Sequence, residues 1–219
     1  MQCPLNYIAE RRQEEKDRRR AQILDAAEAV AATQGFDALT MDQVARRARL
    51  SRALLYVYFK DKADLHLGIC ERGLALLGER FEQAAARHPT GLERIVAIGR
   101  AYVAFAAEFP VHFDAMARFQ AQDVGVGEVT GSVGSCFQAG ERVHQIMFAA
   151  IEAGHKDGSI DPAAGTPVSI AMTLWGCIHG IIQLASTKGD ILGDYGLGGR
   201  GLTDQALQLL AAGLRPGKR

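Results

Sequence analysis

Residues 40–62 constrain the fold of this chain more than any other segment, because they combine two short helices with a tight turn. The run reads T-M-D-Q-V-A-R-R-A-R-L-S-R-A-L-L-Y-V-Y-F-K-D-K. Thr40 and Gln43 form a T-x-x-Q capping box that predicts a helix start, and Ser51 predicts a second start about one turn after the first helix ends. Asp61 predicts a third start. This layout is that of a helix-turn-helix followed by a longer helix.

The remaining sequence favours an all-α fold, because apolar residues recur every three or four positions and strand signals are scarce. We expect a first helix from Arg18 to Gln34, ended by Gly35, with Phe36 folding back as an apolar plug. Thr203 is expected to cap the last helix. Later helices are expected over residues 62–87, 91–108, from 110, 135–156, 166–187 and 203–213, and the glycine-rich stretches 123–134 and 188–201 are expected to be loops.

This order of elements predicts an N-terminal arm over residues 1–17 and a three-helix helix-turn-helix domain over 18–65. A larger C-terminal helical domain, residues 66–219, follows and is expected to serve dimerisation and ligand binding.

Composition indicates a soluble globular chain without a cofactor motif. The net charge of the 219 residues is zero, but residues 1–62 carry twelve Lys and Arg against nine Asp and Glu. This excess has the sign that phosphate binding requires. The N-terminus lacks the apolar core of a secretory signal, and no apolar run reaches the roughly 18 residues that would suggest a membrane span, so we expect a cytoplasmic protein.

The four cysteines, Cys3, Cys70, Cys136 and Cys177, form no C-x-x-C pair, and we predict free thiols, with a thiol sensor as the alternative. No phosphate-binding loop, G-x-S-x-G or H-E-x-x-H motif is present, and no metal or cofactor is expected. A helical enzyme and a helical interaction protein that does not bind DNA are the two rival classes.

The second short helix is expected to enter a DNA major groove, with Arg52 in its first turn as the candidate base reader. Ala53 is placed to touch a thymine methyl group, while Tyr56, Tyr58 and Lys62 are expected to hold phosphates. Leu54, Leu55 and Phe59 are expected to anchor the helix. The full set of expected DNA contacts is Thr40, Met41, Ser51, Arg52, Ala53, Tyr56, Tyr58 and Lys62.

Residues 21–65 resemble the DNA-binding domain of TetR-family transcriptional regulators. The stretch A-R-L-S-R-A-L-L-Y-V-Y-F-K-D-K-A-D-L is similar to the family pattern A-G-V-S-x-G-x-L-Y-x-H-F-x-x-K-x-x-L, and the upstream I-L-D-A-A, G-F and L-T also fit. Three positions depart from the pattern: Arg49 replaces the turn glycine, Ala53 replaces another glycine, and Tyr58 replaces a frequent histidine.

The resemblance implies a homodimer that binds double-stranded operator DNA and a small effector, by family default as a repressor of a palindromic site. The last two long helices are the expected dimer surface. An effector pocket is expected among the helices after residue 62, and its aromatic and soft side chains suit a mainly apolar or aromatic ligand. The expected pocket residues are Tyr102, Phe105, Met116, Phe119, His144 and Trp175.

Overall fold

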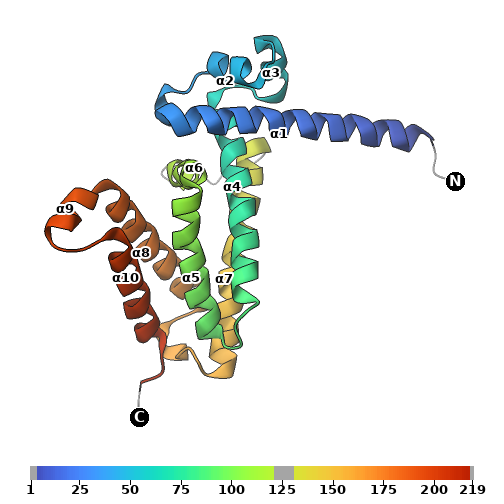
Figure 1. Ribbon diagram of the computed structural model, residues 1–219. Coiled ribbons are helices and arrows are strands. Elements are labelled where there is room, and N and C mark those ends of the chain that lie inside the picture. Colours follow the sequence, from blue (N-terminus) through green and yellow to red (C-terminus); the bar gives the residue numbers. More distant parts are fainter. Residues whose placement is uncertain (1–3, 121–130, 218–219) are drawn as a thin grey trace. The chain divides into compact units, whose positions relative to one another are not determined.

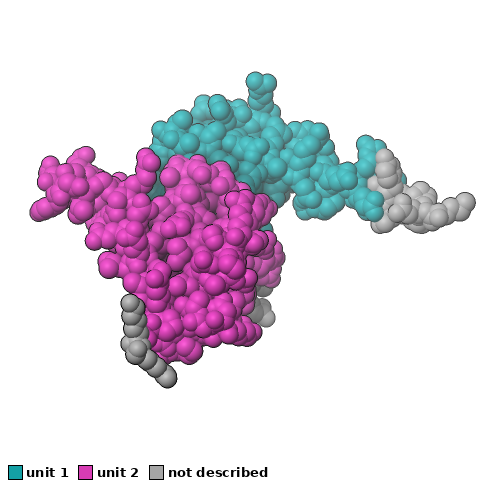
Figure 2. All heavy atoms as spheres, turned by 60° about the horizontal axis from the view of Figure 1, so that its bottom comes forward, with its two compact units in different colours: residues 1–73, 111–136 teal, residues 74–110, 137–219 magenta. Residues whose placement is uncertain are grey.

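The computed structural model describes residues 4–120 and 131–217, and within these residues it contains helices and no strand (Figure 1). The prediction of an all-α fold is therefore confirmed. Contacts divide the chain into two compact units, shown in Figure 2. Unit 1 comprises residues 1–73 and 111–136, and unit 2 comprises residues 74–110 and 137–219.

Unit 1 contains the helix-turn-helix. Helix α1 runs from Pro4 to Ala38, α2 from Met41 to Ala48 and α3 from Arg52 to Tyr58. The first half of α4 (Lys62–Ala85) and nearly all of α6 (Pro110–Gln120) also belong to this unit. Its core includes the fully buried side chains of Ile23, Val44, Leu55, Phe59 and Ile69.

Unit 2 is a bundle built from α5 (Gly91–Glu108), α8 (Pro167–Thr187), α10 (Gly199–Leu214), the end of α4 and most of α7 (Gly131–Asp157). Helix α8 packs against α10 and α5, and the short α9 (Gly189–Asp194) follows α8 (Figure 1). A 3-10 turn, Pro162–Ala164, precedes α8. The contacts thus group residues 66–73 and 111–136 with the helix-turn-helix, whereas the sequence suggested a boundary after residue 65.

The predicted helix starts at Thr40, at Ser51 and before residue 91 are confirmed, because the side chains of Thr40, Ser51 and Thr90 each accept the backbone N–H three residues ahead. Asp61 does the same for Asp64 at 2.8 Å. Gly35 has φ 78° and interrupts α1 where the sequence predicted its end, and Phe36 is buried as expected.

The predicted start of α1 at Arg18 is wrong, since the helix begins at Pro4. Residues 8–17 are exposed, so no core packing drives this extension. Side-chain pairs one turn apart support it, with Gln13 donating to Asp17 at 2.8 Å and Arg19 donating to Glu15 at 3.0 Å.

The expected loop over 188–201 is also wrong, because α9 and the first turn of α10 occupy it. Leu192 is buried and fixes α9 despite the surrounding glycines. Thr203 lies inside α10 rather than at its N-cap, and its buried hydroxyl donates back to the carbonyl of Arg200 at 2.9 Å. Of the other expected loop, 123–134, residues 131–134 are helical and the rest lie outside the described residues.

Helix α8 is long and apolar enough to cross a membrane by length and composition, with a mean hydropathy of 1.5 over its best window. The expectation that no segment reaches this length is therefore wrong. The absence of Asp, Glu, Lys and Arg from residues 167–187 explains the result. One such helix is weak evidence for a membrane span, since core helices of globular proteins pass the same test. In α8 only 22% of this stretch is buried, and the buried residues are Ile170, Ala171, Ile178 and Ile182.

Candidate functional site

The first candidate site is the exposed surface of α2 and α3, which a buried apolar scaffold holds in place. Leu55 and Phe59 have 0% and 1% exposure and anchor α3, as the sequence predicted. Leu54 is 37% exposed, so its expected anchoring role is wrong. In a helix of seven residues only one face can meet the core, and Leu55 and Phe59, four apart, define that face.

The turn between α2 and α3 is closed by Arg49 at the position where the family pattern has glycine. Arg49 adopts a left-handed conformation, φ 57° and ψ 40°, and its backbone N–H bonds the carbonyls of Ala45 and Arg46. The N–H of Leu50 also reaches the carbonyl of Ala45, at 2.9 Å. These bonds satisfy the last carbonyls of α2, so the chain keeps the turn geometry with a residue that is strained in it.

Seven of the eight residues expected at DNA are at least partly exposed, and six of them lie in the exposed class. Tyr58 is half-buried. Met41 is the exception: its side chain is buried in unit 1 and is not available to a ligand. As the first residue of α2, Met41 points into the core while Thr40, one position earlier, stays exposed. The exposed residues are Thr40, Ser51, Arg52, Ala53, Tyr56 and Lys62.

Arg52 carries an oriented positive charge on α3. Its Nε lies 3.2 Å from Oδ1 of Asp42, and its guanidinium carbon lies 5.6 Å from the centre of the Tyr56 ring. The hydrogen bond with Tyr56 and then the charge of Asp42 raise the pKa of Arg52. The guanidinium is therefore charged, exposed and held between α2 and its own helix. Sequence reasoning did not foresee the part that Asp42 plays.

Lys62 begins α4, and its Nζ donates to the carbonyl oxygen of Asp37 at 2.8 Å. The side chain of Asp61 accepts the N–H of Asp64, and the side chain of Asp64 accepts the N–H of Lys60 at 2.9 Å. The start of α4 thus combines an exposed cation with two carboxylates, of which Asp61 already accepts one N–H group of the helix. A phosphate there would meet the cation and the remaining donors only.

The N-terminal arginines divide into two groups. Arg20 pairs with Glu71 at 3.1 Å and lies 5.3 Å above the ring of Phe59, so it supports unit 1. Arg18 and Arg19 both pair with Glu15. A groove beside these residues, which the sequence did not indicate, is lined by Ile8, Arg11, Arg12, Glu14, Glu15, Lys16, Arg18 and Tyr58. It brings the start of α1 next to the end of α3.

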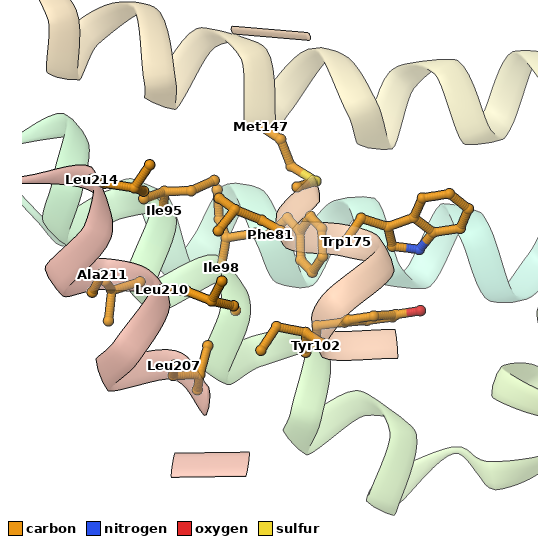
Figure 3. A pocket seen from close by; sticks show the side chains of 14 residues that line it. Phe81, Ile95, Ile98, Tyr102, Met147, Trp175, Leu207, Leu210, Ala211 and Leu214 are labelled. Atoms are coloured by element: carbon orange, nitrogen blue, oxygen red, sulfur yellow. The ribbon is translucent and has the colours of Figure 1, made fainter. Parts of the chain in front are cut away.

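The second candidate site is an apolar pocket inside unit 2 (Figure 3). Its cavity has a volume of about 40 Å³. Residues from five helices form the wall: Phe81 of α4, Ile95, Val96, Ile98, Gly99 and Tyr102 of α5, Met147 of α7, Leu174, Trp175 and Ile178 of α8, and Leu207, Leu210, Ala211 and Leu214 of α10. None of these residues is charged, so the pocket suits an apolar ligand.

The structure places Tyr102 and Trp175 in this wall, as the sequence predicted, but not the other four expected residues. Phe105 is fully buried, and His144 lies behind Trp175 with ring centres 5.8 Å apart. Met116 and Phe119 belong to unit 1, so they do not line the pocket of unit 2. The sequence missed the contribution of α10, because the leucines of an amphipathic helix read equally well as plain core.

Polar groups lie behind Tyr102 at one end of the pocket, outside its lining. Tyr102 Oη and His179 Nδ1 are 2.7 Å apart, and His179 Nε2 lies 3.0 Å from Gln183 Nε2. Burial lowers the pKa of His179 and of His144 and raises that of Tyr102. The imidazoles and the phenol are therefore neutral near pH 7, and this end offers hydrogen bonds without a net charge.

Cys70 and Cys136 lie in the core of unit 1, although the sequence showed no close pair. Cys136 Sγ donates to the carbonyl of Leu67 at 3.1 Å. The hydrogen bond with Cys136, followed by burial, raises the pKa of Cys70, and a buried protonated thiol is a poor nucleophile. Within residues 4–120 and 131–217, no three His, Cys, Asp or Glu side chains are grouped to hold a metal ion.

Comparison with known families gives these sites a context. Residues 23–69 match the model described as "Bacterial regulatory proteins, tetR family". Residues 95–211, more than half of the chain, match "Tetracyclin repressor-like, C-terminal domain". The chain belongs to the TetR family. It is thus a TetR-family transcriptional regulator, and this family consists of DNA-binding regulators rather than enzymes.

Other proteins are similar to this TetR-family regulator in sequence or in structure. The HTH-type transcriptional activator FasR of Mycolicibacterium smegmatis is 33% identical over 90 residues, which span 41% of each protein. A protein of unknown function from Rhodococcus sp. RHA1 has a structure similar over 90% of this chain and 95% of its own, with TM-score 0.74 and 24% identity. The regulator FadR of Bacillus subtilis in complex with stearoyl-CoA matches with TM-score 0.66 and 17% identity, over 89% and 99%.

Proposed function

We propose that this TetR-family regulator is a homodimeric repressor that binds a palindromic operator and is released by a small, mainly apolar or aromatic effector. The observation that supports operator binding is the exposed first turn of α3. Ser51, Arg52 and Ala53 lie on this turn, which the buried Leu55 and Phe59 hold rigidly against the rest of unit 1. The first turn is the part of a recognition helix that enters the major groove.

Each exposed residue has a proposed role on DNA. Arg52 reads a guanine, because a guanidinium can donate to both acceptors on the guanine edge. Ala53 contacts a thymine methyl group. Tyr56, Tyr58 and Lys62 flank this turn and bind phosphates, which fixes the register of α3 without reading sequence. The lysine and arginines of the groove beside Tyr58 are placed to add further phosphate contacts.

A binding assay with labelled DNA from upstream of the protein's own coding sequence tests this reading. Arg52→Ala should weaken binding to the specific site by about 5-fold to 150-fold while binding to scrambled DNA changes little. Arg87→Ala removes the same charge from an exposed position in unit 2 and should leave the ratio of specific to scrambled binding unchanged. Equal affinities of wild type and Arg52→Ala for the specific site would contradict the proposal.

Exposed small and apolar residues on α8 and α10 support the proposed homodimer. On α8, Thr173, Cys177, Gly180 and Leu184 repeat at intervals of three and four and are all exposed. On α10, Leu209 is 67% exposed. The two helices pack against each other within unit 2, so a second copy of the same pair could complete a four-helix bundle.

The pocket of unit 2 supports an effector whose surface is mainly apolar or aromatic. The similar FadR structure contains stearoyl-CoA, whose acyl chain belongs to this apolar class. Helix α4 provides the proposed link to DNA, since Phe81 lines the pocket while Lys62 begins the same continuous helix. Effector binding would shift α4 and thereby change the spacing of the two recognition helices in the dimer.

This coupling requires the effector to bind differently to the free and the DNA-bound protein. An effector that releases DNA must therefore bind the operator complex more weakly than the free dimer, by the same factor by which it weakens DNA binding. Calorimetric titration with and without operator measures this factor. Equal effector affinity in both titrations would refute release by population shift, and in vitro transcription distinguishes a repressor from an activator.

A further inference from the structure

The pocket of unit 2 contains two chemically different ends, and this difference narrows the class of ligand. In Figure 3, Leu214, Ala211 and Ile95 lie at one end, while the hydroxyl of Tyr102 and the ring nitrogen of Trp175 lie together at the other. No Asp, Glu, Lys, Arg or His lines the cavity. An ionised ligand group placed inside would lose its hydration without gaining an opposite charge, which strongly disfavours its binding.

The polar end is held by a chain of hydrogen bonds that runs from Tyr102 through His179 to Gln183. His179 Nδ1 lies 2.7 Å from Tyr102 Oη, and His179 Nε2 lies 3.0 Å from Gln183 Nε2. The imidazole therefore bonds the phenol with one ring nitrogen and the amide with the other. Tyr102 itself has only 4% exposure. Its oxygen is therefore positioned rigidly by α8, through a residue at the edge of the pocket.

We propose that the effector of this regulator is an uncharged amphiphile whose oxygen-containing group hydrogen-bonds Tyr102 Oη. Its apolar body extends from Tyr102 toward Leu214 along the wall formed by α5 and α10. Alcohols, ketones and esters have this chemistry, and carboxylates, amines and quaternary ammonium ions do not. The inference rests on the proposed effector function of the pocket and adds the charge and the orientation of the ligand.

The size of the cavity adds a second requirement. About 40 Å³ accommodates only a few water-sized groups, since one such group needs about 10–15 Å³ by this measure. A longer ligand must therefore displace side chains, and Leu207 of α10 is a candidate. A Cβ atom on Gly99 would stand only 2.5 Å from Leu207 Cδ2, so α10 rests directly on the backbone of α5 at this point. Shortening Leu207 should enlarge the cavity without touching its polar end.

Three probes with the same chain length separate the ligand classes: 1-octanol, octanoate and octylammonium at pH 7.5. Trp175 is the only tryptophan of the chain and lines the pocket, so its fluorescence reports binding directly. 1-Octanol should bind at least about tenfold more tightly than either charged probe. Leu207→Ala should bind 1-octanol more tightly than wild type.

Removal of the hydroxyl tests the orientation. Tyr102→Phe should weaken 1-octanol binding by about fivefold, which is the contribution of one neutral hydrogen bond. The weaker binding that the octyl chain provides by itself should not change. Tyr195→Phe, at a tyrosine that is 77% exposed on the segment after α9, is the matched control and should bind like wild type.

The proposal is overturned if octanoate or octylammonium binds as tightly as 1-octanol, or if Tyr102→Phe binds 1-octanol as wild type does. Failure of both wild type and Leu207→Ala to bind 1-octanol also overturns it. A separate DNA-release assay keeps the two proposals apart. If 1-octanol binds through Tyr102 but leaves operator binding unchanged, the ligand class stands and the effector role fails.

Discussion

At the scale of single residues, Arg49 offers a direct test of the helix-turn-helix geometry. Its positive φ of 57° costs an L-residue about 1 kcal/mol, whereas glycine adopts this conformation freely. Arg49→Gly should therefore raise the free energy of unfolding by up to about 0.5 kcal/mol, after allowance for the greater freedom of glycine in the unfolded chain. Urea unfolding followed by circular dichroism measures the change.

Arg47→Gly is the control for this substitution, because it removes the same charge from an exposed position inside α2. Glycine within a helix should lower the free energy of unfolding by about 0.5–1 kcal/mol. Changes of equal sign in the two variants would show that the turn is not strained at Arg49.

The residues of α2 and α3 also show how far sequence reasoning reaches. The caps at Thr40 and Ser51 were predictable because each cap is a local hydrogen bond between neighbours in the chain. The burial of Met41 and the exposure of Leu54 were not, because both depend on which face of a short helix meets the core. The pairing of Arg52 with Asp42, ten positions apart, likewise requires the fold.

At the scale of helices, the contact between α5 and α7 depends on two glycines. A Cβ atom on Gly91 would stand 2.0 Å from the backbone nitrogen of Gly154 and 2.5 Å from the carbonyl oxygen of Ala150. Backbone cannot move aside as a side chain can, so Gly91→Ala should force the helices apart. We expect a loss of about 3 kcal/mol or more in the free energy of unfolding, measured by urea unfolding with Trp175 fluorescence.

Gly78→Ala serves as the matched substitution in α4. The added Cβ would meet Val143 at an ordinary 3.8 Å, so the variant should gain about 0.5–1 kcal/mol from the better helix former. A Gly91→Ala protein as stable as wild type would mean that α5 and α7 do not approach as closely as described.

Helix boundaries were predictable where a capping residue precedes an apolar run, as at Thr90. Their prediction failed where the sequence is rich in glycine. Residues 188–201 contain enough glycine to indicate a loop, yet α9 forms because Leu192 gains a buried position. Thr203 illustrates the opposite error, since a threonine inside a helix can bond its own preceding turn and resemble a cap in sequence.

His144 of α7 and His179 of α8 should make the stability of unit 2 depend on pH. Burial lowers the pKa of His144 and of His179, so the folded state binds fewer protons than the unfolded chain. Their contribution to stability is complete above the ordinary histidine pKa of about 6.5 and decreases as the pH falls below it. The urea midpoint reported by Trp175 should therefore decrease between pH 7.5 and 5.5. A His144→Gln, His179→Gln double variant should show a smaller decrease, and an identical slope would exclude these two histidines as the cause.

At the scale of the whole molecule, the pocket was harder to predict than the fold. Its aromatic members could be named from composition, but their grouping could not. Tyr102 and Trp175 share one cavity, while Met116 and Phe119 belong to the other compact unit. The helical period identifies the buried face of each helix, whereas the identity of the neighbouring helices depends on contacts between distant segments. The family comparison confirmed the resemblance to TetR-family regulators, and the packing of unit 2 added the chemistry of its cavity.

The proposed dimer gives the last prediction, because a palindromic operator requires two recognition helices at a fixed separation. Gly180 lies on the exposed face of α8, and a Cβ atom there would meet no heavy atom within 4 Å in the single chain. Gly180→Arg should therefore fold normally but place a charge in the interface. We expect a monomer by analytical ultracentrifugation at micromolar concentration, with operator affinity reduced by at least about 100-fold and an unchanged helical circular dichroism spectrum. Ala104→Arg, on the exposed side of α5, introduces the same charge and should remain dimeric. A Gly180→Arg protein that stays dimeric and binds the operator like wild type would place the interface on another surface, and the assignment of α8 to dimerisation would be wrong.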